Sequence, residues 1–124
     1  MTRPHASPAH AHLPLHPLEF QILLSLVRGP AHAYAVVRAI EERQPEWSRI
    51  LPTNMYRRIW RLESKGLVAE VQDGERPEAG RRKYFSITET GRAVAEAEAT
   101  RLRALLGEAK RAGITGMIPE GRSA

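Results

Sequence analysis

The amino-acid sequence predicts a mainly helical fold with one small β-hairpin, followed by a long C-terminal helix. Residues 53–67 place charged and apolar side chains on different sides when they are read at helical spacing. Two short runs of β-forming residues follow, at residues 67–72 and 82–87. The segments before and after this region have apolar residues at helical spacing. Together these patterns predict the order helix, helix, helix, strand, strand, helix.

The size and charge of the chain limit its class. With 124 residues, it has room for one domain with a single core. The formal net charge of +5 at pH 7 favours a polyanionic partner, with an acidic protein or an anionic membrane surface as alternatives. We expect neither a membrane span nor a secretory signal, because no sufficiently long apolar run is present. Cysteine is absent, which removes disulfide and thiol chemistry and fits a cytoplasmic location.

Residues 1–14 are rich in Pro, Ala and His and show neither helical nor strand periodicity, which predicts a disordered arm. Four of the five histidines, His5, His10, His12 and His16, lie in this arm or just after it. The arm lacks the cysteines or spaced carboxylates that would complete a closed metal shell. We therefore expect no metal ion or other cofactor, while metal sensing by the arm stays open as an alternative.

Two helices are expected before residue 44. The first begins near Pro17, a residue suited to the first turn of a helix, and ends at residues 28–30. The second is expected over residues 31–43. Residues 44–52 are predicted to form a loop, in which Trp47 either lines a ligand cavity or seals the edge of the core. The apolar positions of the first helix are Leu18, Phe20, Ile22, Leu23, Leu26 and Val27.

Residues 53–65 are predicted to form a recognition helix, a helix whose exposed side reads DNA. Thr53 is expected to cap its start, and Gly66 is expected to end it. Arginine pairs its donors with guanine or phosphate, and asparagine can read adenine, although a solvated basic face is the alternative. One arc of the helix holds Asn54, Arg57, Arg58, Arg61 and Lys65, a separate apolar stripe holds Met55, Ile59 and Leu62, and Tyr56 and Trp60 form a ridge beside the arc.

The two β-forming runs predict a hairpin with a cationic returning strand. Residues 73–80 between them are polar, rich in turn-forming residues and too numerous for a tight turn. Arg81, Arg82 and Lys83 open the second strand. Such a hairpin fits a wing that reaches DNA phosphates, and a solubilising charge cluster on an edge strand is the alternative.

A last helix is expected to begin after Thr88, which is suited to cap it, with Glu89 complementing the helix dipole. Its apolar side has little of its own domain to cover it, so we expect it to pair with the same helix of a second copy. That apolar side consists of Val94, Ala97, Leu102, Leu105 and Leu106.

No arrangement of catalytic residues is evident. Ser, His and Asp residues are not grouped, and neither a glycine-rich phosphate loop nor a pair of carboxylates stands out. We therefore expect a binding protein and not an enzyme.

The predicted order of elements is that of a winged helix-turn-helix, and several segments also resemble the PadR-like transcriptional regulators. Residues 29–34 (Gly-Pro-Ala-His-Ala-Tyr) are similar to the family's segment between its first two helices. Residues 55–67 resemble its third helix, and residues 80–92 resemble its wing and the start of its last helix. The likeness covers about residues 15–110. Ala33, Thr53-Asn54 and Trp60 depart from the family's usual residues.

The resemblance implies a homodimeric repressor that binds double-stranded DNA at an inverted repeat, with half-sites about 10 to 10.5 base pairs apart. Together with the composition of the two ends, this predicts four parts: an arm (1–14), a winged helix-turn-helix (15–88), a dimerisation helix (89–115) and a frayed tail (116–124). Some relatives release DNA when they bind a small aromatic effector, for which Trp47 and Trp60 are candidate contacts. A protein-binding module and a ligand-operated sensor are the alternatives. The expected DNA contacts are Thr53, Asn54, Tyr56, Arg57, Arg58, Arg61, Lys65, Arg81, Arg82 and Lys83, and the expected dimer contacts are Leu18, Leu23, Val94, Ala97, Leu102, Leu105 and Leu106.

Overall fold

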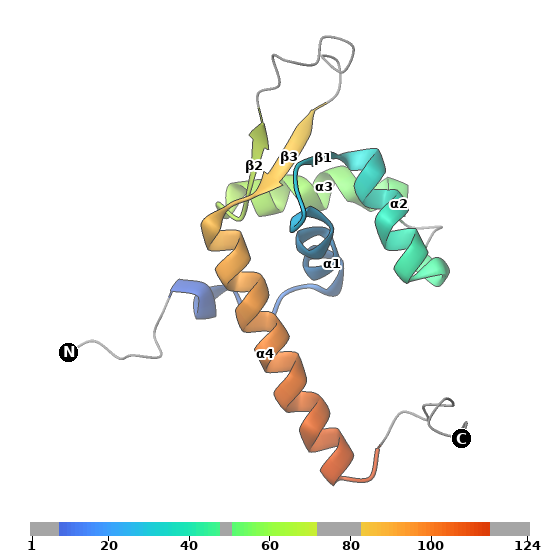
Figure 1. The fold of residues 1–124 in the computed structure, drawn as a ribbon, viewed down its shortest axis with the longest axis vertical. Helices are drawn as coiled ribbons and strands as arrows, with labels where there is room; N and C mark the ends of the chain where they lie inside the picture. The colour runs from blue at the N-terminus through green and yellow to red at the C-terminus, as the bar shows by residue number, and fades with distance from the viewer. Residues whose placement is uncertain (1–7, 48–50, 72–82, 115–124) are drawn as a thin grey trace, which may run out of the picture.

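The computed structural model describes residues 8–47, 51–71 and 83–114. A three-helix domain with a small sheet is followed by one long helix that extends away from it (Figure 1). The predicted fold class, mainly helical with a β-hairpin and a C-terminal helix, is therefore confirmed. The elements, in chain order, are the 3-10 helix η1 (Pro8–His12), α1 (Pro17–Leu26), β1 (Ala31–His32), α2 (Ala33–Arg43), the 3-10 helix η2 (Pro45–Trp47), α3 (Leu51–Ser64), β2 (Val68–Val71), β3 (Tyr84–Ile87) and α4 (Glu89–Arg111).

The core lies where α1 packs against α2, α3 and the first part of α4. The apolar residues of α1 recur at helical spacing, and Ile22, Leu23 and Leu26 are almost completely buried. The predicted stripe of α3, Met55, Ile59 and Leu62, is buried as well. This burial fixes which side of α3 is turned toward solvent.

Two histidines cap the first helices. The Nδ1 atom of His16 accepts the backbone N–H of Leu18 at the start of α1, and Pro17 occupies the first turn as predicted. The Nδ1 atom of His32 accepts the N–H of Ala35 at the start of α2. Neither capping role was predicted from the sequence, because histidine is not among the residues that usually cap helices.

The sheet is antiparallel, with the strand order β1-β3-β2. The predicted hairpin is confirmed, since Val68 pairs with Ile87 and Val71 pairs with Tyr84. A third strand was not foreseen. Ala31 and His32, expected in the second helix, pair with Phe85 and Tyr84, so α2 begins only at Ala33. Two residues are too few for sequence periodicity to reveal a strand.

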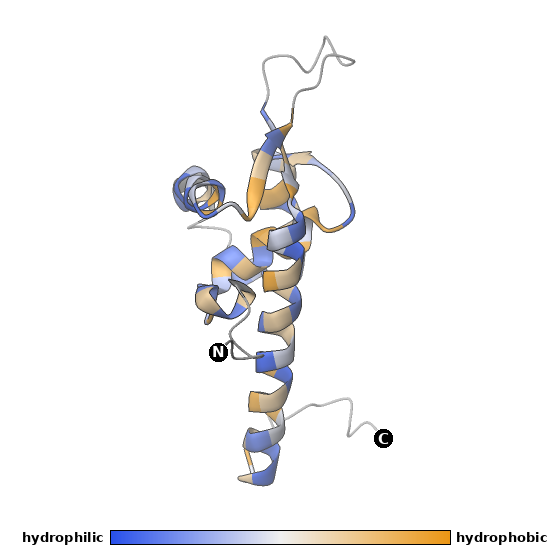
Figure 2. Cartoon of the chain, turned by 90° about the vertical axis from the view of Figure 1, so that its left-hand side faces the viewer, coloured by the Kyte–Doolittle hydropathy of each residue, from blue (hydrophilic) through white to orange (hydrophobic). Residues whose placement is uncertain are grey.

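The long helix α4 begins as predicted, because the Thr88 hydroxyl accepts the N–H of Gly91 and also donates to the carbonyl of Gly66. Its first turns bury Val94 and Ala95 against the domain. The rest projects away from the core, and apolar residues continue along this projecting part (Figures 1 and 2). Leu102, Leu105 and Leu106 are exposed there. Among the described helices, none has the length and apolar character required to cross a bilayer.

Residues 8–14, which the sequence predicts to be part of a disordered arm, are ordered. Residues 8–12 form η1, which packs against α4, and Leu15 lies in the core. The buried carboxylate of Glu98 accepts the N–H of Leu15 at 3.4 Å and receives two hydrogen bonds from Arg101. The hydrogen bond with Arg101 holds the pKa of Glu98 below its ordinary value, and the Leu15 N–H acts in the same direction. The expectation of disorder is wrong for residues 8–14, because α4 supplies contacts that are remote in sequence; residues 1–7 lie outside the described part.

The start of α3 also differs from the prediction. The helix begins at Leu51, so Thr53 lies inside the first turn and is not the N-cap. Pro52 stands near the start of this helix, a position that tolerates a residue without a backbone N–H. Gly66 adopts a positive φ of 80°, and the N–H of Leu67 bonds to the carbonyl of Leu62, which ends the helix as predicted.

Candidate nucleic-acid interface

The outward face of α3 carries two aromatic and two cationic side chains. Tyr56 and Trp60 are 66% and 65% exposed, although aromatic residues of this size are usually more buried. Arg57 and Arg61 are also exposed. Neither arginine forms an ion pair with any residue that the structure describes. Both guanidinium groups are therefore available to a ligand outside the protein.

The other two cations of the predicted arc form ion pairs with another residue of the domain. Arg58 Nη1 lies 3.3 Å from Glu19 Oε2, and Lys65 Nζ lies 3.4 Å from Glu19 Oε1. Glu19 is on α1 and is only 2% exposed. The expected arc of five polar residues is thus divided, with Arg57 and Arg61 outward and Arg58 and Lys65 held by a buried carboxylate.

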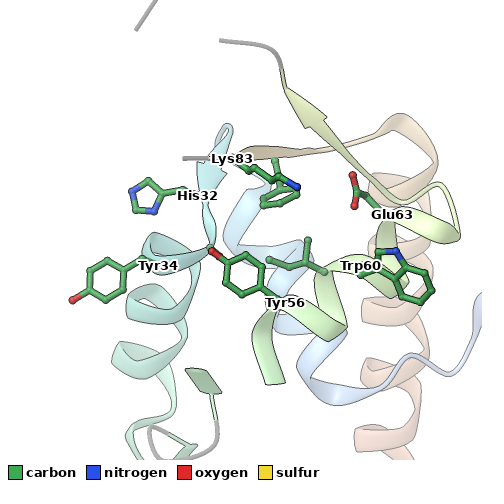
Figure 3. A pocket seen from close by; sticks show the side chains of 9 residues that line it. His32, Tyr34, Tyr56, Trp60, Glu63 and Lys83 are labelled. Carbon is green, nitrogen blue, oxygen red and sulfur yellow. The ribbon is translucent and has the colours of Figure 1, made fainter. Parts of the chain in front are cut away.

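A hollow of about 580 Å³ lies between the outward face of α3, the start of α2 and strand β3. His32 and Tyr34 stand on one side of it, Trp60 and Glu63 on the other, with Tyr56 and Lys83 between them (Figure 3). The hollow thus joins the third helix to β3 and to Lys83, which precedes this strand; the prediction that Lys83 lies within the strand is wrong, because β3 begins at Tyr84. Its full lining is His32, Ala33, Tyr34, Tyr56, Ile59, Trp60, Glu63, Lys83 and Phe85.

His32, which caps α2, also packs against the aromatic residues on one side of this hollow. The ring of His32 stacks on Tyr34 with a centroid distance of 6.4 Å and meets Tyr84 edge-on at 5.4 Å. The guanidinium of Arg38 lies 5.7 Å from the centre of the Tyr34 ring. Tyr34 is 62% exposed, so this arrangement holds an aromatic face at the rim of the hollow. Tyr34 lies within the second helix predicted from the sequence, but helical spacing gives no sign of this placement.

The helix-capping histidine of α1 lies beside the Glu19 ion pairs. Burial, and then the positive charge of Arg58, hold the pKa of His16 below its ordinary value, while Glu19 acts in the opposite direction. The cap requires Nδ1 to be unprotonated, because this atom accepts the N–H of Leu18. The charges around His16 and its hydrogen bond therefore favour the same neutral form.

The remaining predicted contacts are distributed unevenly. Asn54 is half-buried near the start of α3, and Lys83 is exposed at the edge of the hollow. The side chain of Thr53, together with Arg81 and Arg82, lies outside the described residues. Trp47 is half-buried and packs against the core, away from the hollow that Trp60 lines. The two tryptophans therefore share none of the described cavities.

The predicted dimer contacts divide into core and surface. Leu18, Leu23 and Val94 are buried in the core, which corrects the expectation that they face a second copy. Helical spacing identified them as apolar but could not tell an internal contact from an external one. Ala97 is half-buried, whereas Leu102, Leu105 and Leu106 are exposed on the projecting part of α4.

A three-helix core, an exposed third helix and an antiparallel hairpin beside it define a winged helix-turn-helix protein. The sequence pattern of the transcriptional regulator PadR-like family matches residues 22–97, which include most of this domain and the start of α4. The chain therefore belongs to the PadR-like family of transcriptional regulators, and the resemblance inferred from the sequence is confirmed.

One curated relative is an uncharacterized 37.1 kDa protein from a transposon of Streptomyces fradiae, with 37% identity over 86 residues. The match covers 69% of this chain but only 23% of that protein.

Among solved structures, the chain is similar in fold to a transcriptional regulator from Clostridium thermocellum, with a TM-score of 0.62 and 19% identity. That match covers 82% of this chain and 93% of the regulator. A mutant of Lactococcus lactis ZitR gives a TM-score of 0.61 with 17% identity over 95% of this chain and 73% of that one. Another ZitR mutant, solved in complex with DNA, gives 0.56 with 17% identity and covers 97% and 71%. These likenesses concern the fold.

Proposed function

We propose that the protein is a homodimeric repressor that binds a specific DNA sequence through α3. The observation that carries this proposal is the outward face of α3. Arg57 and Arg61 are exposed there beside Tyr56 and Trp60 and form no ion pair with residues 8–47, 51–71 or 83–114. An α-helix fits the major groove, and arginine is the side chain that most often reads guanine there. Membership of a family of transcriptional regulators and a similar fold solved with DNA support the same function.

The division of labour follows from the positions of the side chains. Arg57 and Arg61 enter the groove, with Asn54 as a further base-reading residue near the start of α3. The Tyr56 hydroxyl and the Lys83 ammonium group contact phosphates of the DNA strand that passes the hollow between α3 and β3. Arg81 and Arg82, which precede Lys83 in the sequence, continue this contact along the wing.

The projecting part of α4 provides the dimer contact in this proposal. Leu102, Leu105 and Leu106 are exposed along it, and pairing with the same helix of a second copy would cover them. Ala97, which is half-buried nearer the domain, extends this contact. A two-fold dimer then requires an inverted-repeat operator with half-sites about 10 to 10.5 base pairs apart.

The hollow also suggests how DNA could be released. Its aromatic walls, Tyr34, Tyr56 and Trp60, suit a small planar aromatic effector, and its volume of about 580 Å³ lies within the range of small-molecule sites. Because the hollow opens on the DNA-facing side of α3, such an occupant would compete directly with DNA. Quenching of Trp fluorescence that disappears in Trp60→Phe but persists in Trp47→Phe would support this step.

The function is tested by a salt titration of binding to the DNA upstream of the protein's own coding region, beside a random duplex of equal length. Binding about a thousand-fold tighter to the first duplex is expected for a specific regulator. In vitro transcription from the same DNA should decrease when the protein is added. Equal affinity for both duplexes, lost together as salt rises, would show only electrostatic attraction.

The alternative function is a winged-helix module that uses the same exposed face to bind an acidic protein. The exposed Trp60 and Tyr56 favour this alternative, since both residue types are common at protein interfaces. This alternative predicts weak binding to every duplex in the titration, so the same experiment separates the two functions.

A further inference from the structure

We infer that Glu19 is a positioning residue for DNA reading, one that selects which cations of α3 face the groove. Its buried carboxylate holds Arg58 and Lys65 along the inner edge of α3 and leaves Arg57 and Arg61 on the outward face. This inference rests on the proposed DNA-binding function. It assigns a role to a residue of α1, a helix that is distant in sequence from α3.

The geometry gives each carboxylate oxygen its own cation. Oε2 of Glu19 lies 3.3 Å from Arg58 Nη1, and Oε1 lies 3.4 Å from Lys65 Nζ. The two cations are seven residues apart, about two helical turns or roughly 10 Å along a helix axis. One carboxylate therefore connects α1 to the last two turns of α3 and to the residue that follows it.

Arg58 is committed to this interior position. Its side chain is only 20% exposed, and its Nε atom is buried without a hydrogen-bond partner in the described part of the chain. A buried guanidinium depends strongly on its counter-ion, because an unpaired charge is costly to remove from water. Without Glu19, Arg58 would be expected to turn toward solvent, where DNA phosphates compete for it.

Glu19 also neutralises positive charge that would otherwise strengthen binding to DNA of any sequence. Phosphate contacts by lysine and arginine strengthen binding to any duplex, whereas base contacts distinguish one duplex from another. Pairing two cations with Glu19 reduces the phosphate contacts that they could make. Since Arg57 and Arg61 keep their outward positions, the base contacts are retained, and the ratio of specific to random binding rises.

The apolar stripe of α3 by itself leaves this choice open. Met55, Ile59 and Leu62 determine which side of the helix is buried, but contacts between apolar side chains are not directional. Arg58 lies at the edge of that stripe, where its long side chain could extend either inward or outward. The position of a carboxylate on α1 makes the inward arrangement favourable.

The experiment compares Glu19→Gln with the wild type on operator and random duplexes over a range of salt. We expect the ratio of operator to random affinity to fall at least tenfold, with random binding unchanged or tighter. The salt dependence should become steeper by about 0.9 to 1.8 in log–log slope, the effect of one or two additional phosphate contacts. All binding is measured at a temperature where circular dichroism shows each variant to be folded.

Glu108→Gln is the matched control. It removes the same charge and also breaks an ion pair with arginine, since Arg111 Nη2 lies 2.6 Å from Glu108 Oε2, but it lies at the far end of α4. It should leave the affinity ratio unchanged. If Glu19 only stabilised the fold, operator and random binding of Glu19→Gln would fall together with the salt slope unaltered, and the inference would be overturned.

A second variant keeps the inference testable if Glu19→Gln fails to fold. Lys65 is 38% exposed, so Lys65→Gln is expected to fold normally. If Glu19 holds Lys65 away from DNA, this variant keeps the salt slope of the wild type; a decrease of about 0.9 would show a phosphate contact and overturn the inference. A wild-type protein without operator preference would refute the proposed function, whereas a preference retained in Glu19→Gln would refute this inference alone.

Discussion

The Cα atom of Gly91 lies directly against the carbonyl oxygen of Leu67, so close that a Cβ atom added at residue 91 would overlap it. The same carbonyl accepts the N–H of Thr88 at 3.0 Å, and the Thr88 hydroxyl donates to the Gly66 carbonyl at 2.7 Å. The start of α4 is therefore joined to the turn between α3 and β2 by close packing and two hydrogen bonds. This junction sets the direction in which α4 leaves the DNA-binding domain.

Gly91→Ala should destabilise the protein by about 1 to 3 kcal/mol, the usual cost of forcing extra atoms into a packed site. The added Cβ would meet the Leu67 backbone, which cannot move without disturbing the Thr88 hydrogen bonds. Gly107→Ala is the control, because its Cβ would meet only the Arg111 guanidinium, at 3.7 Å. Alanine there should stabilise the helix by up to about 1 kcal/mol. Urea unfolding measures both, and equal effects would contradict the close contact at Gly91.

Arg61→Ala should weaken operator binding by about 1 to 3 kcal/mol with a smaller effect on a random duplex, the pattern of a base contact. Lys83→Ala should weaken both duplexes alike and reduce the salt slope by about 0.9, the pattern of a phosphate contact. Arg111→Ala, at the end of α4 away from the hollow, should change neither. Fluorescence anisotropy with both duplexes measures these effects. An equal loss on both duplexes for Arg61→Ala would exclude base reading by this residue.

Leu106→Glu should shift the protein from dimer to monomer, because it places a charge in the exposed apolar row that the proposed dimer covers. Operator affinity should fall with it, since one half-site alone would then be bound. Tyr34→Glu introduces the same charge at another exposed apolar residue, outside α4, and should leave the dimer intact. Sedimentation velocity distinguishes these states. A wild-type protein that sediments as a monomer at micromolar concentration would contradict the proposed assembly.

Thermal stability should decrease as the pH falls below 6.5, because the pKa of His16 in the folded protein is lowered from that ordinary value. His16 then binds a proton in the unfolded chain at a pH where it stays neutral in the folded chain. The stability that neutral His16 contributes is fully present above about pH 6.5. It is lost as the pH falls toward the lowered pKa of His16 in the folded protein. His16→Asn keeps a capping side chain that does not titrate, so its unfolding temperature should vary less over this interval. Parallel pH profiles for both proteins would contradict the assignment.

Much of the fold could be predicted from the sequence because its signals are local. Pro17 marked the start of α1, Thr88 marked the cap of α4, and two runs of β-forming residues separated by turn-forming residues marked the hairpin. The errors occurred where a distant contact decides the structure. Residues 31 and 32 become a strand because β3 pairs with them, and residues 8–12 are ordered by packing against α4.

The candidate site was predicted in composition but not in arrangement. Helical spacing correctly separated the buried Met55, Ile59 and Leu62 from the polar residues of α3. It also grouped Arg57, Arg58, Arg61 and Lys65 as one cationic face. The structure divides this group, and it joins His32 and Tyr34 to Lys83 around one hollow, although these residues come from segments about fifty positions apart.

The class of this protein can be read from its sequence alone, since periodicity, helix caps and family motifs depend on residues close together in the chain. Which cations of α3 face outward depends on contacts between residues that are far apart in the chain. Glu19 is 39 positions before Arg58, and no pattern of spacing shows that its carboxylate lies under α3. The physical reason is that burial of an ionised carboxylate requires a counter-ion, and folding brought Arg58 and Lys65 to it from a distant helix.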